Sequence, residues 1–149
     1  MTRGYLLDTS VISALTPGRE MHLSSGFAQW LQERHERLFI PCIAIAGLEQ
    51  GICKLRRAGA KQRADALATW LDGLLVAFDE RLLPLDTVTA RIAGRFSENA
   101  MAQGRHPGFA DVAIAAIASR ASLLLLTRNL KHFEPLGVPC SDPVLVLPD

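Results

Sequence analysis

Residues 108–129 read GFADVAIAAIASRASLLLLTRN. An acid, Asp111, stands at the head of an otherwise apolar, alanine-rich segment, which predicts a helix that packs closely against a sheet. The four leucines at 123–126 are too apolar for any place except a strand in a sheet covered on both faces. Asn129 follows directly, in Thr127-Arg128-Asn129. The stretch therefore predicts a parallel α/β sheet with polar side chains at the carboxyl end of a strand.

The same alternation of strands and helices extends along the chain. Further strands are expected at residues 5–7, 38–40 and 82–85 and in the tail at 142–147, with Pro84 indicating an edge strand. Helices are expected from Thr9 or Ser10 to Pro17, and over about 23–37, 44–59, 61–78 and 87–104. The pattern predicts a single domain over residues 1–149: a three-layer α/β/α fold with a mainly parallel sheet of four to five strands.

Composition sets the class of protein. The chain has 149 residues, of which 49% are hydrophobic and 21% charged, as expected for one folded domain. The start of the chain resembles no signal peptide, and the three cysteines form no disulfide framework, so a cytoplasmic location with reduced thiols is expected. The four histidines show no HxxxH pair, which gives a zinc site little support.

The net charge of +1 does not indicate nucleic-acid binding by the chain as a whole. A local patch is nevertheless present, because five cations fall within ten residues: Lys54, Arg56, Arg57, Lys61 and Arg63. They are either contacts to a phosphate backbone or a solvated helix end and turn.

A second acid, Asp8, closes the predicted strand at residues 5–7. Carboxyl ends of parallel strands share one crevice, where ligands bind. Asp8 and Asp111 would repel each other there unless a proton or a hard cation joined them, so a metal site is predicted. Each acid is also a plausible helix cap, and Asn129 a plausible start of a turn. Arg128 is a surface charge or a phosphate contact.

Three hydroxyl residues near these acids, Thr9, Ser10 and Thr127, are either caps or groups that orient carboxylates or waters. Arg128, Thr9 and Thr127 are accordingly the candidate substrate-binding residues.

Four stretches, in order along nearly the whole chain, resemble one family: residues 6–13 (LLDTSVIS), 48–52 (LEQGI), 108–116 (GFADVAIAA) and 126–133 (LTRNLKHF). They resemble the PIN-domain ribonucleases, and among them the VapC-like toxins of bacterial toxin–antitoxin pairs. Asp142-Pro143 is similar to a common ending of the family.

The resemblance implies that the protein is the toxin of a type II toxin–antitoxin system. It implies that this toxin is an endoribonuclease that uses Mg²⁺ or Mn²⁺. It implies Asp8 and Asp111 as metal-binding acids and Asn129 as a catalytic position that helps to order metal and water. It also implies an RNA substrate, a homodimer and a cognate antitoxin, a segment of which occupies a hydrophobic groove. Apolar residues of the helices between Ala44 and Phe78 are candidates for these protein surfaces.

One position departs from the family pattern. The pattern Glu-Leu-x-x-Gly reads here Gly47-Leu48-Glu49-Gln50-Gly51, so glycine stands where the family has an acid. Glu49 is a poor substitute, because two residues along a helix turn a side chain by roughly 200°. Glycine costs about 1 kcal/mol relative to alanine inside a helix. The glycine reflects an engineered substitution, natural loss of the acid, or close helix packing, and weak metal binding with slow or absent RNA cleavage is predicted.

Two alternatives remain at this stage. The first is a non-catalytic PIN-like module that engages an antitoxin or RNA. The second is a phosphotransfer domain with Asp8 as nucleophile. We rank the phosphotransfer domain last. Asp8-Thr9-Ser10 lacks the second acid that phosphatases with an aspartyl nucleophile use, and no lysine follows the later strand in a suitable position.

Overall fold

The computed structural model describes residues 4–19 and 25–148. Its centre is a five-stranded sheet in the order β3-β2-β1-β4-β5. The strands are β1 (Tyr5–Leu7), β2 (Leu38–Pro41), β3 (Leu82–Leu83), β4 (Leu124–Leu126) and β5 (Cys140–Ser141). All four pairings are parallel, so every strand presents its carboxyl end to the same edge of the sheet. The predicted fold class is confirmed.

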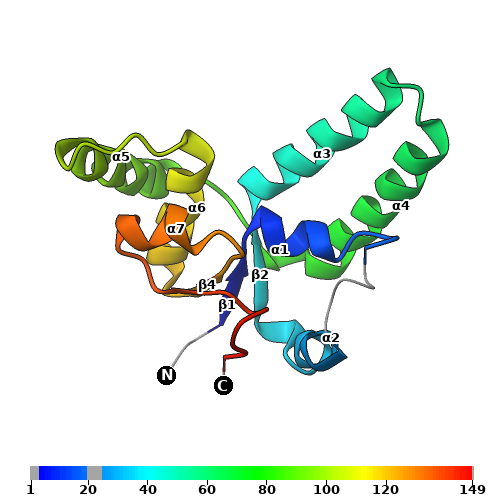
Figure 1. Ribbon diagram of the computed structural model, residues 1–149, viewed down its shortest axis with the longest axis horizontal. Helices are drawn as coiled ribbons and strands as arrows, with labels where there is room; N and C mark the ends of the chain where they lie inside the picture. Colours follow the sequence, from blue (N-terminus) through cyan, green and yellow to red (C-terminus); the bar gives the residue numbers. More distant parts are fainter. Residues whose placement is uncertain (1–3, 20–24, 149) are drawn as a thin grey trace.

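Helices cover both faces of the sheet. They are α1 (Thr9–Ala14), α2 (Ser25–Glu33), α3 (Cys42–Arg57), α4 (Lys61–Phe78), α5 (Thr87–Ala102), α6 (Phe109–Ala121) and α7 (Leu130–Phe133). In Figure 1, α1 to α4 lie on one side of the strands and α5, α6 and α7 on the other, with α3 and α4 side by side as a projecting pair. In the described part of the chain, no helix has the length and apolar character needed to cross a membrane.

The alternation of side chains along β1 explains why the sheet is buried on both faces. Tyr5 and Leu7 pack in one core cluster with residues of α1, α2 and the end of α4. Leu6 points the other way and packs with Leu125 and with apolar residues of α6. A central strand with no solvent-facing side has to be apolar throughout, as predicted from the leucines of β4.

Several predicted boundaries agree with the structure. The helix expected at 61–78 coincides with α4, and β3 lies at the edge of the sheet, as Pro84 indicated. Asp86 caps α5, because its carboxylate accepts the Thr89 N–H at 2.9 Å, and this bond lowers the pKa of Asp86. The helix expected at 23–37 is shorter: residues 23 and 24 lie outside the described part, α2 ends at Glu33, and a 3₁₀ turn covers His35–Arg37.

The predicted last strand at 142–147 is wrong. The final strand is β5, and residues 143–145 form a turn. The Asp142 carboxylate accepts the Val144 N–H at 2.9 Å, and the Asp142 carbonyl accepts the N–H groups of Leu145 and Val146. Proline at 143 has no N–H for a sheet, so these local bonds outweigh the apolar alternation in the tail.

Gly4 immediately precedes β1, where the chain passes close to the backbone before β2. A Cβ at this position would stand 2.7 Å from the carbonyl oxygen of Arg37. We expect Gly4→Ala to lower the free energy of unfolding by about 1–3 kcal/mol through overpacking, measured by urea denaturation. Gly94→Ala on α5 is the matched control: nothing lies within 4 Å of its Cβ, so it should stabilise the protein by about 0.5–1 kcal/mol. Equal effects of both variants would contradict this account of Gly4.

Candidate active site

Asp8 joins the carboxyl ends of β1 and β4. Its N–H donates to the carbonyl of Leu126 at 2.9 Å, which extends the β1–β4 ladder by one residue. The residue occupies the N-cap position of α1, yet its carboxylate makes no capping bond. The sequence had suggested Thr9 or Ser10 as the N-cap, and neither residue occupies that position. Asp8 as a whole is only 4% exposed, so its carboxylate is neither a helix cap nor a solvated surface charge.

Two hydroxyl groups hold the Asp8 carboxylate. Ser10 Oγ and Thr127 Oγ1 each donate to Oδ2 of Asp8 at 2.8 Å. Thr127 is completely buried, and its Oγ1 accepts the N–H of Asn129 at 2.9 Å. Ser10 Oγ accepts the N–H of Arg128 at 3.0 Å. These bonds orient the acid and tie the loop after β4 to it, so Ser10 and Thr127 have the geometry of positioning residues.

Asp111 lies in the first turn of α6 with its side chain 30% exposed. Burial raises the pKa of the Asp111 carboxyl; the neighbouring His132, whose Nδ1 lies 3.3 Å from Oδ2, opposes that rise, and the negative charge of Asp8 adds to it. Both acids also contact the segment that follows β4, Asp8 through Thr127 and Asp111 through His132 of α7, so both lie near the carboxyl end of β4. That one cation joins them stays a prediction.

The other predicted residues surround this rim. Asn129 is half-buried at the N-cap position of α7 and makes no side-chain capping bond, while Arg128 is exposed. Thr9 is half-buried and lies beside Gly47 of α3, because a Cβ built on Gly47 has the Thr9 methyl group, at 3.9 Å, as its nearest neighbour. A longer side chain at 47 has room there. Close helix packing is therefore not the reason for this glycine.

The acids present suit a hard cation but do not enclose one. Asp8 and Asp111 supply carboxylate oxygens, the donors that Mg²⁺ and Mn²⁺ prefer. Within residues 4–19 and 25–148, no group of three or more His, Cys, Asp or Glu side chains is placed to hold a metal. The donor set fits a weakly held ion that keeps several waters of its own.

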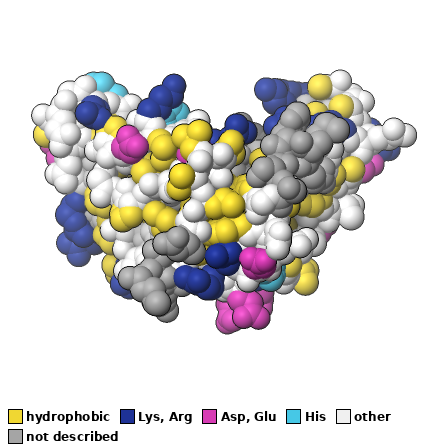
Figure 2. Space-filling model, turned by 60° about the horizontal axis from the view of Figure 1, so that its bottom comes forward, with side chains coloured by type: hydrophobic (Ala, Val, Ile, Leu, Met, Phe, Trp, Pro, Cys, Tyr) yellow, Lys and Arg dark blue, Asp and Glu magenta, His cyan; other side chains and the backbone are white. Residues whose placement is uncertain are grey.

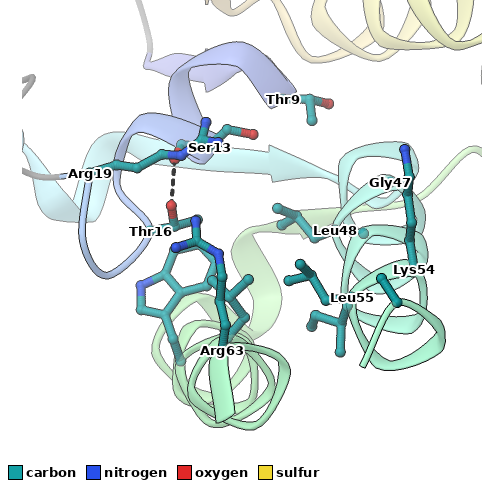
Figure 3. A pocket seen from close by; sticks show the side chains of 14 residues that line it. Thr9, Ser13, Thr16, Arg19, Gly47, Leu48, Lys54, Leu55 and Arg63 are labelled. Atoms are coloured by element: carbon teal, nitrogen blue, oxygen red, sulfur yellow. Dashed lines mark hydrogen bonds between the residues drawn. The ribbon is translucent and has the colours of Figure 1, made fainter. Parts of the chain in front are cut away.

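A groove of ≈ 420 Å³ opens on one side of the acid pair, between α1, α3 and α4. Figure 3 shows Leu48 and Leu55 pointing into it from α3, with Arg63 extending toward Thr16 and Arg19 toward Ser13. Thr9 and Gly47 also line the groove, so it reaches the candidate site. Among the described residues, its lining contains cations and apolar side chains but no acid.

A second cleft, of ≈ 500 Å³, opens on the other side of the acid pair and has Asp111 in its wall. Its lining includes four basic residues to which the sequence analysis assigned no role: Arg105, His106, Lys131 and His132. The available signal was the pairing of a cation with a histidine in two short segments, at 105–106 and 131–132. Their convergence depends on the fold, since α7 lies beside α6.

Comparison with known proteins agrees with this architecture. The family model of the PIN domain matches residues 5–135. The chain belongs to the PIN domain family. The VapC ribonuclease Y4jK of Sinorhizobium fredii is 29% identical over 140 residues, which cover 93% of this chain and 96% of that protein.

Solved PIN-like structures superpose closely on this chain. The crystal structure of FitAcB from Neisseria gonorrhoeae has a TM-score of 0.78 and 29% identity, covering 93% of this chain and 97% of that one. The structure of DNA-bound VapBC from Salmonella typhimurium also has a TM-score of 0.78, with 21% identity, over 93% and 97% of the two chains. The second likeness shows the fold alone.

The raised pKa of Asp111 predicts a pH-dependent stability of this PIN domain. In the absence of metal, the folded state binds a proton more tightly at Asp111 than the unfolded chain does. Stability should therefore fall as pH rises from the ordinary Asp value through the raised one. Asp111→Asn should lack this decline and be the more stable protein at neutral pH. Urea midpoints of both proteins in EDTA between pH 3 and pH 7 measure the difference; parallel pH profiles would contradict it.

Proposed function

We propose that this chain is a metal-dependent endoribonuclease toxin of a type II toxin–antitoxin system, with activity limited by glycine at position 47. The observation that supports the proposal is that Asp8 and Asp111 both contact the segment after β4, through Thr127 and His132, in a chain of the PIN domain family. The similarity to a VapC ribonuclease supports RNA as the substrate.

Each residue of the rim has a part in this proposal. Mg²⁺ or Mn²⁺, when bound by Asp8 and Asp111, supplies an activated water and stabilises charge on the scissile phosphate. Ser10 and Thr127 keep Oδ2 of Asp8 in one orientation, so little ordering is needed when substrate arrives. Asn129, whose N–H donates to the Thr127 hydroxyl that holds Asp8, is the polar group proposed to order water. Arg128 is exposed and free to contact a phosphate oxygen.

Gly47 would limit the site because it offers a cation no ligand from α3. A glutamate at 47 would start beside Thr9, the residue that follows Asp8, and would add a third carboxylate to the rim. With two acids a cation would be held loosely, so the site would less often hold the charge needed at the scissile phosphate. The exposed Glu49 does not line the groove that Gly47 lines, so it does not replace the missing acid.

Restoring the acid tests the assignment. We expect Gly47→Glu to cleave single-stranded or structured RNA at least about tenfold faster than the parent with Mg²⁺ or Mn²⁺, because a third carboxylate tightens the metal. Cleavage of a labelled RNA pool is measured over time at matched protein concentration.

Two control variants make that test specific. Gly47→Gln has nearly the same shape without the charge, so it should stay close to the parent. Adding Asp8→Asn to Gly47→Glu should remove the gain. Cleavage by Gly47→Gln equal to that of Gly47→Glu would contradict a metal-ligand role at this position.

The groove between α1, α3 and α4 is the proposed docking place of the antitoxin. Its floor is apolar, with Leu48, Leu55 and Trp70, and its rim carries Arg19, Lys54 and Arg63. Such a surface suits an amphipathic segment with acidic residues on one side. A segment bound there would pass Thr9 and Gly47 and so cover the approach to the acids.

Charge reversal on the rim tests the docking surface. The cognate antitoxin is first identified by co-purification with the tagged chain, and its affinity is then measured by titration calorimetry. Arg63→Glu and Lys54→Glu should each weaken binding by about tenfold or more, because like charges then face each other. Arg95→Glu on α5, which is exposed and outside the groove, is the matched control. Equal losses in all three variants would contradict the assignment of this groove.

A second candidate function, a non-catalytic module that engages an antitoxin or RNA, is favoured by one observation. In the described part of the chain, no three metal-binding side chains converge. The Gly47→Glu experiment separates the two, since a chain whose restored variant stays inactive retains only a binding role. The homodimer implied by the family resemblance stays a prediction.

A further inference from the structure

The second cleft, beside Asp111, has a charge pattern that the proposed catalytic residues do not use. Two separate segments build it: the loop between α5 and α6 supplies Arg105 and His106, and α7 supplies Lys131 and His132. The remaining lining comes from Ala100, Pro107, Gly108, Pro135 and Leu136, which carry no charge, and from Asp111.

Positive charge in this cleft exceeds the negative charge of its lining within the described residues. Arg105 and Lys131 are exposed, and the ion pairs found within the described residues include neither of them. Asp111 is the one acid in the lining that the structure describes, and its contact is with His132. Two permanent cations in a cleft without a matching pair of acids create a local potential that attracts anions.

The cleft is contiguous with the proposed site, because Asp111 belongs to both. A nuclease needs such charge there, since two carboxylates on the rim repel the phosphates of an approaching strand. In Figure 2, Lys and Arg side chains stand on both sides of the hollow at the upper edge of the molecule. The cleft beside Asp111 has a small apolar floor, unlike the leucine-rich groove on the other side.

We propose that the cleft of Arg105, His106, Lys131 and His132 binds a backbone phosphate of the RNA strand, next to the phosphate that is cut. This inference rests on the proposed nuclease function and deepens it by assigning the strand's position. Arg105 and Lys131 supply the charge, and contact is to the backbone, so binding is independent of base sequence. The substrate strand thus leaves the acid pair across α7 and the loop before α6, away from the groove proposed for the antitoxin.

The test measures RNA binding without cleavage. A short fluorescently labelled single-stranded RNA is titrated with the full chain in EDTA at several salt concentrations, and anisotropy gives the Kd. Arg105→Ala and Lys131→Ala should each weaken binding and reduce the slope of log K against log salt by about 0.7, the value for one lost contact to a single strand. The loss should be the same for RNAs of different sequence.

Three controls accompany these variants. Arg95→Ala removes an equal charge from an exposed position on α5 outside the cleft and should leave the slope unchanged. Arg105→Lys keeps the charge and should bind close to the parent. Matching circular dichroism spectra and melting temperatures establish that each variant is folded, which is expected because Arg105 and Lys131 are exposed.

Each remaining outcome decides the matter. If the parent binds RNA and Gly47→Glu cleaves it, but the cleft variants behave like Arg95→Ala, the subsite is overturned and the proposed function stands. If the cleft variants lose the antitoxin and keep RNA, the cleft belongs to a protein interface and the subsite is again overturned. If neither RNA binding by the parent nor cleavage by Gly47→Glu is found, the proposed function fails and the subsite fails with it.

Discussion

The hydrogen bonds between Asp8 and the end of β4 are the constraint on which the candidate site depends. One bond is part of the sheet: the Asp8 N–H donates to Leu126. The others are made by side chains, with Thr127 and Ser10 donating to the same carboxylate oxygen. Because β1 and β4 are adjacent and parallel, residues 8 and 127 meet although the chain between them forms most of the molecule. Loss of this junction would release both the acid and the loop that carries Arg128 and Asn129.

In the absence of a bound partner, the charges around this junction lower the stability of the folded protein. Burial and the neighbouring Asp8 raise the pKa of Asp111, so the ionised carboxyl lowers stability. Such unfavourable pairs of acids are common where a protein binds a cation. On either side, the lining of the groove and that of the second cleft carry cations. The acid rim between them is therefore flanked by two surfaces suited to anionic partners of different kinds, one with a broad apolar floor and one without.

The sequence and the fold give different information about Gly47. Its place in a Gly-Leu-x-x-Gly stretch, set against the Glu-Leu-x-x-Gly pattern of the family that the chain resembles, singled it out as a missing acid. The fold adds that space exists at this position and that Thr9 is its nearest neighbour. In the tail, by contrast, the sequence was misleading. Its alternating apolar residues predicted a strand, but Asp142 and Pro143 make a turn there. Local hydrogen bonds determine the conformation of the tail because its apolar side chains are exposed and gain little from burial.

The sequence by itself determined the parallel α/β class, the approximate places of most helices and the candidate acids, and its resemblance to the PIN family marked the departure at Gly47. These follow from local periodicity, capping residues and short motifs, which act within a few residues along the chain. Only the tertiary structure decided that Asp8 is held by Ser10 and Thr127 rather than capping α1, and that Arg105 and His106 face Lys131 and His132 across one cleft. These contacts join residues distant in sequence. Strand order and helix packing set them, and no local pattern of residues encodes either.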